Sequence, residues 1–189
     1  MTFKSLNPIA AKILKHGGTG IIPTDTIYGL TGSAFNKRAV ARIYKLRRRN
    51  PKKPMIILIG QLSDLKKFQI NLSPVSKKLV SKFWPAKVSI VLDCPSPKFR
   101  YLHRGTKTLA FRLPKPSARG GSSFGGKKLR EFLKKTGPLV APSANLEGKP
   151  PAKTIKQAQK YFGDKVDFYV EAGKLNSVPS KIIKISGSK

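Results

Sequence analysis

Five cationic side chains lie within seven positions of the segment Arg47-Arg48-Arg49-Asn50-Pro51-Lys52-Lys53. If this segment leaves a helix in an extended conformation, Arg47 and Arg49 project to one side and Arg48 to the other, because side chains alternate along a strand. Two guanidinium groups on one side match phosphate oxygens and neutralise the charge that develops during phosphoryl or nucleotidyl transfer. The pattern indicates an anion-binding pair, although such a segment taken alone is more often a solvated basic loop.

A second polar segment follows the apolar residues 20–23. Thr24, Asp25 and Thr26 supply two hydroxyls and a carboxylate, and Tyr28-Gly29 would let the backbone bend closely around a ligand. A Thr-Asp-Thr turn that stands alone is more often structural than ligand-binding. This segment therefore becomes a candidate site only in combination with others.

A third polar segment, Pro142-Ser143-Ala144-Asn145, follows an apolar run at residues 139–141. Alternation along an extended chain puts Ser143 and Asn145 on one face and Ala144 on the other. The hydroxyl and the amide supply donors and acceptors that suit phosphate and nucleotide groups at the carboxyl end of a strand. An asparagine-capped turn is the alternative interpretation of this segment.

The three polar segments lie next to predicted strands. Short β-like runs alternate with helical patterns, most of which follow Asn, Ser or Thr caps. The expected strands are residues 20–23, 55–59, 88–92, 108–113, 139–141, 166–170 and 181–185. The expected helices are residues 37–46, 74–83, 127–136 and 155–162, with one more that follows Asn7 and ends at Gly17. Such alternation predicts an α/β domain in which helices cover a sheet and ligands bind where strands end.

Net charge is the most extreme property of the composition. The chain has 39 Lys and Arg against 8 Asp and Glu, which gives a formal net charge of +31. So positive a surface attracts polyanions and indicates contact with RNA. The cations are spread along the chain, however, which equally fits solvated surface residues and a compositional bias of the source organism. The scarcity of carboxylates argues against a hydrolase with paired Asp or Glu and against a carboxylate metal cage.

Cysteine and histidine counts limit the redox and metal chemistry. Cys94 is the one cysteine, and with two histidines it offers neither an internal disulfide nor a Cys/His zinc site, so we expect an inert thiol. Trp84 is expected in the core. The N-terminal residues lack a signal-peptide core and no segment has the apolar length of a membrane span, which predicts a cytoplasmic protein with a single domain over residues 1–189.

One glycine-rich segment gives a misleading signal. Residues 121–128 nearly match the phosphate-cradling loop of nucleotide-binding proteins, but Lys128 replaces the hydroxyl residue that would hold magnesium. No apolar strand precedes the segment. We therefore expect residues 115–126 to form a flexible loop rich in Gly, Ser and Pro.

Six sequence blocks together resemble the signature blocks of the YrdC-like (TsaC-like) threonylcarbamoyl-AMP synthases. The blocks are PTDTIYGL, Arg47-x-Arg49 followed by KPMIIL, FWPAKVSIVL, LAFRLP, PSANLEGKPPAKT and KLNSVPSKII. They follow one another in the family's order over nearly the whole chain. The resemblance implies a twisted mixed β-sheet wrapped by helices around a deep basic cavity.

The resemblance also implies an activity and its site residues. The enzyme would condense L-threonine, bicarbonate and ATP, bound with Mg²⁺, into threonylcarbamoyl-AMP and pyrophosphate, with no structural metal in the protein. A downstream threonylcarbamoyl-transferase complex would then complete the threonylcarbamoyladenosine (t6A) modification of tRNA. Carried onto this chain, the catalytic residues are Arg47 and Arg49, the ATP-binding residues are Arg47, Arg49, Lys53, Ser143, Asn145 and Ser180, and the threonine-binding residues are Thr24, Thr26, Tyr28 and Arg112.

Two other functions fit the same blocks. A non-catalytic member of this fold could bind double-stranded RNA or tRNA through its basic cavity. Such binding would weaken steeply with salt and ignore ATP, whereas the enzyme would bind ATP and threonine jointly. A carbamoyl-transfer module like that of hydrogenase maturation factors is less favoured, because those chains carry additional domains.

Overall fold

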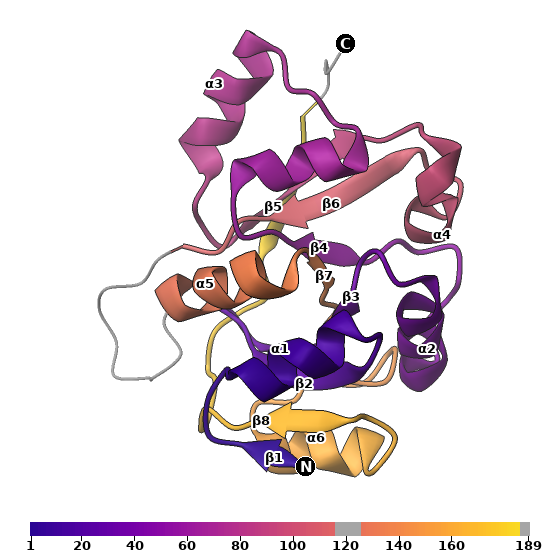
Figure 1. The fold of residues 1–189 in the computed structure, drawn as a ribbon, viewed down its shortest axis with the longest axis vertical. Helices are drawn as coiled ribbons and strands as arrows, with labels where there is room; N and C mark the ends of the chain where they lie inside the picture. Colours follow the sequence, from indigo (N-terminus) through magenta and orange to yellow (C-terminus); the bar gives the residue numbers. More distant parts are fainter. Residues whose placement is uncertain (116–125, 186–189) are drawn as a thin grey trace.

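A nine-stranded mixed sheet forms the centre of the molecule, in the strand order β1-β8-β2-β3-β7-β4-β6-β5-β9 (Figure 1). The computed structural model describes residues 1–115 and 126–185, so most of the loop predicted at residues 115–126 lies outside the described residues. The strands are β1 (Thr2–Phe3), β2 (Thr19–Pro23), β3 (Tyr28–Ser33), β4 (Ile56–Leu58), β5 (Val88–Asp93), β6 (Thr108–Arg112), β7 (Leu139–Val140), β8 (Phe168–Val170) and β9 (Lys181–Lys184). Parallel and antiparallel pairs alternate irregularly in this sheet, which confirms the predicted mixed α/β fold.

The helices begin where side chains cap their first turns. Asn36 accepts a hydrogen bond from the backbone N–H of Ala39 at 2.9 Å, and Asn7, Ser73 and Thr154 cap three further helices in the same way. The helices are α1 (Pro8–Lys15), α2 (Lys37–Arg47), α3 (Pro74–Phe83), α4 (Arg100–His103), α5 (Gly126–Thr136) and α6 (Ile155–Phe162), with the 3-10 segments η1 (Leu62–Phe68) and η2 (Pro97–Phe99). The five predicted helices are confirmed near their expected bounds. None of the helices in the described part of the chain has the length and apolar character needed to cross a bilayer.

The two faces of the sheet carry two separate apolar clusters. On one face α1 and α5 lie side by side, and their Leu14 and Leu133 pack with Leu58 of β4 (Figure 1). On the other face the cluster includes Ile43 of α2 together with Ile57 of β4. Neighbouring residues of β4 thus belong to opposite faces, as alternation along a strand requires. Residues two positions apart on a strand therefore share a face, which locates the side chains of the site described below.

The strand β3 and the segment η1 lie outside the predicted elements. The interpretation of Tyr28-Gly29 as a bend around a ligand is wrong, because β3 pairs antiparallel with β2 in a register that sets Pro23 opposite Tyr28. The strand sequence YGLTGS contains two glycines and only one alternating apolar pair, Tyr28 and Leu30, so local sequence gives little sign of a strand. Its pairing with β2 and β7 on its two sides supplies the stability that local propensity does not.

Trp84 occupies the core, as the sequence predicts, and Cys94, for which the sequence predicts an inert thiol, is buried there too. The indole N–H of Trp84 donates to the carbonyl of Val88 at 2.8 Å, and the residue is 6% exposed. Cys94 is 1% exposed, and burial raises the pKa of its thiol to about 11. A thiol of this kind is a packing group.

We expect Cys94 to resist alkylation in the folded protein. The thiolate is the reactive form, and a buried thiol with a raised pKa supplies little of it near neutral pH. Iodoacetamide at about pH 8 should leave the native protein unmodified by mass spectrometry, whereas protein unfolded in guanidinium should gain a single adduct. Equal rates of modification in the two states would show that Cys94 is accessible.

Candidate functional site

A cavity of about 360 Å³ opens beside the carboxyl end of α2, and we call it the site cavity. It is lined by Arg47, Arg49, Pro54, Met55, Ile56, Val91, Thr106, Thr108, Ala110, Pro142, Ser143 and Ile182. Ile56 lies two residues before Leu58, so by alternation it occupies the sheet face that α1 and α5 cover farther along β4. Both charged residues of this lining are arginines, which favours an anionic ligand.

Arg47 is buried in the wall of the site cavity and joins α2 to the segment after β7. Its Nε donates to the backbone carbonyl of Asn145 at 3.0 Å, and its Nη2 donates to Oγ of Ser143 at 3.2 Å and to Oδ1 of Asn145 at 3.1 Å. The residue is 3% exposed, and its Nη1 has no hydrogen-bond partner among the described residues. Burial, and then the nearby charge of Arg49, lowers the pKa of this guanidinium to about 10, so Arg47 remains cationic near neutral pH. A buried charged donor without a partner requires an acceptor, and an anionic ligand would supply one.

The turn after α2 has a different conformation from the predicted one. Arg47 is the last residue of α2, and Arg48 ends the helix in the left-handed region with a φ of 51°. The predicted extended conformation of these arginines is therefore wrong. Arg47 and Arg49 nevertheless both line the site cavity, because the left-handed residue turns the chain. Arg49 is held there by hydrogen bonds from Nε to the carbonyl of Lys53 at 3.2 Å and from Nη2 to the carbonyl of Pro54 at 2.8 Å.

Lys53 pairs with Glu147 instead of lining the site cavity. Its Nζ lies 3.2 Å from Oε1 of Glu147, and its side chain is 61% exposed. The other carboxylate oxygen of Glu147 accepts the backbone N–H of Asn50, and this hydrogen bond is the main cause that lowers the pKa of Glu147. The backbone N–H of Glu147 also donates to the carbonyl of Arg47 at 2.8 Å. These contacts connect the segment after α2 to the segment after β7, and contact of Lys53 with ATP stays a prediction.

Ser143 and Asn145 project to the same side, as the sequence predicts, and both contact Arg47 there. Ala144 between them is fully buried in the apolar cluster on the other side. Ser143 lines the site cavity, whereas the amide of Asn145 also donates to the carbonyl of Lys149 at 2.6 Å. The structure therefore makes Asn145 a residue that holds Arg47, and its direct contact with ATP stays a prediction.

Two of the residues predicted to bind threonine, Thr24 and Thr26, lie in the turn between β2 and β3, and a third, Tyr28, begins β3 directly after it. The hydroxyl of Thr24 donates to the carbonyl of Ile27 at 2.6 Å and accepts the backbone N–H groups of Thr26 and Ile27 at 3.2 Å. Tyr28 is fully buried, and its hydroxyl donates to the carbonyl of Gly173 at 2.8 Å. Thr24 and Tyr28 thus fix the turn. Contact of Thr24, Thr26 and Tyr28 with threonine stays a prediction.

The tip of this turn carries a buried ion pair. Oδ1 of Asp25 lies 3.1 Å from Nη2 of Arg112 on β6, and both side chains are 5% exposed. Burial raises the pKa of Asp25, and the charge of Arg112 opposes that rise. Arg112 shares its sheet face with Ala110 of the site cavity, because the two are two residues apart on β6. Nε of Arg112 has no hydrogen-bond partner among the described residues, which leaves a second buried cationic donor next to the cavity wall.

Ser180 lies directly before β9, at the edge of the sheet. Its hydroxyl oxygen is 2.8 Å from that of the buried Ser89 on β5. By alternation, both serines share a face with Val91 and Ile182, which line the site cavity. Ser180 is not itself a lining residue, so its contact with ATP stays a prediction.

Sequence reasoning missed Thr106, Thr108 and Ile182 as cavity residues. Thr108 and Arg112 lie four positions apart on a strand that was predicted, so alternation alone would have put both on one face. Thr106 lies in the turn before β6, and Ile182 is brought to the cavity by the pairing of β9 with β5. The local sequence around these residues does not predict either position. Among the described residues, no three His, Cys, Asp or Glu side chains gather as a metal site would require.

Comparison with known proteins relates the chain to one family. The family model of Sua5, YciO and YrdC, described as telomere recombination, matches residues 12–189. A putative threonylcarbamoyl-AMP synthase of Mycobacterium tuberculosis (strain CDC 1551) is 29% identical over 182 residues, which cover 95% of this chain and 78% of the relative. Another protein of that name, from Methanocaldococcus jannaschii, is 30% identical over 180 residues, which cover 94% of this chain and 79% of the relative.

Solved structures agree with the sequence matches. The crystal structure of Pyrococcus abyssi Sua5 complexed with L-threonine has a TM-score of 0.78 at 27% identity and covers 95% of this chain. The match covers 50% of the Sua5 chain, so the present chain spans about half the length of that protein. Escherichia coli YciO shares the fold with a TM-score of 0.79 at 21% identity, over 99% of this chain and 90% of YciO. The family match over residues 12–189, supported by this fold, shows that the chain belongs to the Sua5/YciO/YrdC family.

Proposed function

We propose that this protein is a threonylcarbamoyl-AMP synthase, which condenses L-threonine, bicarbonate and ATP into threonylcarbamoyl-AMP and pyrophosphate. The observation that carries the proposal is the buried guanidinium of Arg47, which has an unpartnered Nη1 among the described residues and shares the cavity wall with Arg49. Relatives named for this activity match nearly the whole chain, and the related P. abyssi protein was crystallised with L-threonine. The site cavity thus offers a buried cationic donor that lacks a partner among the described residues. A related structure in the same family holds L-threonine, which carries a carboxylate.

The proposed reaction requires positive charge more than acid or base catalysis. The amine of threonine attacks bicarbonate and water leaves, which gives an N-carboxylate. An oxygen of this carboxylate attacks the α-phosphorus of ATP, and the bond to pyrophosphate breaks. Fixed cationic donors bring the two anionic reactants together and stabilise the charge of the transition state. Mg²⁺ enters as MgATP, coordinated mainly by phosphate oxygens and water.

The nucleotide is assigned to the site cavity. Arg47 and Arg49 are assigned as the catalytic residues, because both of these cations line the site cavity, and Ser143 adds a hydroxyl beside Arg47. Lys53 and Ser180 lie at the margins and are assigned to outer contacts with the same nucleotide. Asn145 acts through Arg47, whose guanidinium it holds with two hydrogen bonds.

Threonine is assigned to the region between Arg112 and the turn after β2. Nε of Arg112, which has no partner among the described residues, is a suitable donor for the carboxylate of an amino acid, and Asp25 holds Nη2 of the same guanidinium. Thr24 and Thr26 lie in the turn that carries Asp25, and Tyr28 follows it at the start of β3, so all three shape this region even where their hydroxyls form hydrogen bonds within the protein.

The product is assigned to t6A synthesis in the cytoplasm, where a threonylcarbamoyl-transferase complex would pass the group to tRNA. The non-catalytic alternative, in which the cavity itself holds RNA, is less favoured. Nη1 of Arg47, which has no partner in the part of the chain that the structure describes, is buried in the wall of a cavity of about 360 Å³. A small anion enters such a place more easily than a duplex backbone does.

Arg49→Ala should weaken the binding of MgATP about tenfold or more, because a hydrogen bond to a charged group contributes about 1.5–3 kcal/mol. Isothermal titration with MgATP, in the presence and absence of threonine, measures the effect. Arg48→Gly is the matched control, because it removes the same charge from an exposed residue whose left-handed φ of 51° suits glycine. An equal loss of MgATP affinity in the two variants would mean that only the net charge of the protein matters. That result would contradict the assignment of Arg49 to the nucleotide.

A further inference from the structure

Four buried side-chain polar atoms in the described part of the chain have no hydrogen-bond partner there, and they belong to three residues. They are both carboxylate oxygens of Asp25, Nε of Arg112 and Nη1 of Arg47. The proposed function assigns the two arginines to anionic ligands but assigns no ligand to Asp25. Because a buried polar atom without a partner is costly, the carboxylate of Asp25 indicates that a ligand brings a donor to it.

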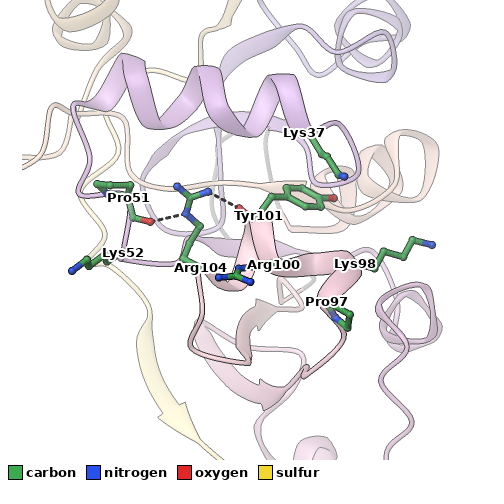
Figure 2. A pocket seen from close by; sticks show the side chains of 8 residues that line it. All are labelled: Lys37, Pro51, Lys52, Pro97, Lys98, Arg100, Tyr101 and Arg104. Carbon is green, nitrogen blue, oxygen red and sulfur yellow. Dashed lines mark hydrogen bonds between the residues drawn. The ribbon is translucent and has the colours of Figure 1, made fainter.

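A larger hollow elsewhere on the molecule lacks this property. It has a volume of about 540 Å³, lies where α4 packs near the start of α2, and is lined by five cations, among them Arg104 (Figure 2). Arg104 donates to the carbonyl of Pro51 at 2.6 Å and to that of Tyr101 at 3.4 Å. None of the eight residues that line this hollow, all within the described ranges, has a buried side-chain polar atom without a partner. Unpartnered buried groups are therefore a property of Asp25 and the two arginines, and not of concave basic surfaces in general.

The contact between Asp25 and Arg112 leaves the carboxylate incompletely bound. Oδ1 of Asp25 lies 3.1 Å from Nη2 of Arg112, which is close enough for an ion pair. No donor among the described residues, however, is aligned for a hydrogen bond to either oxygen. The pair thus presents acceptors without donors on Asp25 and a donor without an acceptor on Arg112, and a ligand with both charges would satisfy the two together.

The turn that carries Asp25 packs against the segment that forms one side of the site cavity. Gly29 forms an isolated bridge with Ser143, which lines that cavity together with Pro142. A Cβ added at Gly29 would lie 3.2 Å from Cγ2 of Thr24 and 3.6 Å from the carbonyl oxygen of Pro142. Thr24 is the neighbour of Asp25 in the chain, so this close packing ties the turn to the cavity wall.

A free amino acid carries the two charges that this pair would satisfy. Its ammonium and its carboxylate are attached to the same carbon atom. If Arg112 holds the carboxylate, as the proposed function assigns, the ammonium lies beside the partner of Arg112, which is Asp25. An ammonium group has three N–H donors, which suit the two acceptor oxygens of a carboxylate.

We propose that Asp25 binds the α-ammonium group of threonine and accepts a proton from it, so that the neutral amine can attack bicarbonate. The inference rests on the proposed function, which supplies the substrates. An α-amino group is protonated near neutral pH and then has no lone pair for the attack. One proton passes from the ammonium nitrogen to a carboxylate oxygen of Asp25. The nitrogen forms a bond to the carbon of bicarbonate, and a second N–H proton leaves with a hydroxyl group as water. The proton on Asp25 returns to solvent after the product leaves.

The surroundings of Asp25 suit a proton acceptor. Burial has the largest influence and raises the pKa of its carboxyl, whereas the charge of Arg112 and, less strongly, that of Lys87 lower this pKa. Lys87 lies directly before β5, and its Nζ donates to Oγ of Ser177 at 2.8 Å. The backbone N–H groups of Asp25 and Lys115 also lower the pKa, without completing a hydrogen bond to the carboxylate. A raised pKa makes the carboxylate a stronger base for the ammonium proton.

The test follows the activity of Asp25→Asn as a function of pH. Formation of threonylcarbamoyl-AMP is measured from about pH 7 to about pH 9.5, a range that includes the ordinary pKa of an α-amino group of about 8. Circular dichroism confirms at each pH that the variant is folded. At about pH 7, kcat/KM for threonine should be about a hundredfold or more below the wild type, as expected when a general base is lost. This deficit should shrink by about tenfold or more near pH 9.5, because threonine then arrives with a neutral amine.

Thr24→Val is the matched control for a displaced turn. It keeps Asp25 but removes the hydroxyl whose hydrogen bonds to Thr26 and Ile27 fix the same turn. A displaced turn should lower activity by the same factor at every pH. If Asp25→Asn also loses the same factor at every pH, or loses nothing at pH 7, Asp25 is not the proton acceptor and the proposal is wrong.

A binding measurement separates this proposal from the proposed function. Isothermal titration, with and without AMP, compares L-threonine with the analogue in which a hydroxyl replaces the α-amine. The preference for threonine should fall about tenfold or more in Asp25→Asn, because a charge-assisted hydrogen bond is lost. If the wild type forms no threonylcarbamoyl-AMP but its preference for threonine depends on Asp25, the proposed function fails and the ammonium site stands. If the wild type is active and Asp25→Asn keeps the preference, the ammonium site fails and the proposed function stands.

Discussion

Replacing Arg47 with alanine should remove synthase activity and lower the stability of the protein together. The substitution leaves Oδ1 and the backbone carbonyl of Asn145 and the hydroxyl of Ser143 without their present donor. Each buried group without a partner costs about 1–3 kcal/mol, so we expect the free energy of unfolding to fall by about 3 kcal/mol or more. Loss of the donor that we assign to the phosphates of ATP should lower kcat by about a hundredfold or more. Urea unfolding and a pyrophosphate-release assay measure the two effects.

Arg47→Lys separates the two roles of this side chain. Lysine keeps the charge but lacks the planar guanidinium, whose Nη2 donates to both Ser143 and Asn145. It also has no second nitrogen in the place of Nη1. We expect it to retain more activity than Arg47→Ala. If Arg47→Ala is destabilised but, below its unfolding temperature, binds MgATP and turns over like the wild type, Arg47 is a structural residue and its catalytic assignment is wrong.

Replacing Asp25 with asparagine should give the second large effect. The substitution preserves the size of the side chain but leaves the buried charge of Arg112 without its counterion. Breaking a buried ion pair at one partner costs about 3–5 kcal/mol, and urea unfolding should show a loss of this order. Threonine-dependent activity should fall as well, because the guanidinium that we assign to the carboxylate of threonine would lose its contact with Asp25.

Two further variants show whether the effect of Asp25→Asn comes from the unpaired charge of Arg112. Asp25→Asn/Arg112→Met removes both charges, so it should recover much of the stability but none of the threonine-dependent activity. Asp164→Asn removes one carboxylate at an exposed position and should leave stability nearly unchanged. If Asp25→Asn unfolds at the same urea concentration as the wild type, the ion pair does not stabilise the fold.

Local patterns in the sequence were sufficient to predict features that depend on a single helix or strand. The helix α2 begins directly after Asn36, whose side chain caps it as predicted, and its apolar spacing indicates its length. Alternation likewise placed Ser143 and Asn145 on one side of the chain. The pattern could not show that the group on that side is Arg47, because this contact depends on how α2 packs against the segment after β7.

Contacts between distant segments account for most of what the sequence did not show. The strand β3 has little strand character of its own and exists because β2 and β7 pair with it. Asp25 and Arg112 form a pair only because the turn after β2 reaches β6 across the sheet. Arg48 takes a left-handed conformation that favours glycine, so its identity gave no sign of the turn that directs Arg47 and Arg49 to one cavity.

The most direct test of the central claim is the formation of the proposed product from labelled bicarbonate. Purified protein is incubated with radiolabelled bicarbonate, L-threonine and MgATP, and both labelled threonylcarbamoyl-AMP and pyrophosphate are followed. We predict that the two form in equal amounts, that both require threonine, and that Arg47→Ala and Arg49→Ala abolish both. Pyrophosphate release that ignores threonine, or the absence of labelled adenylate from folded protein that binds MgATP, would contradict the assignment of this protein as a threonylcarbamoyl-AMP synthase.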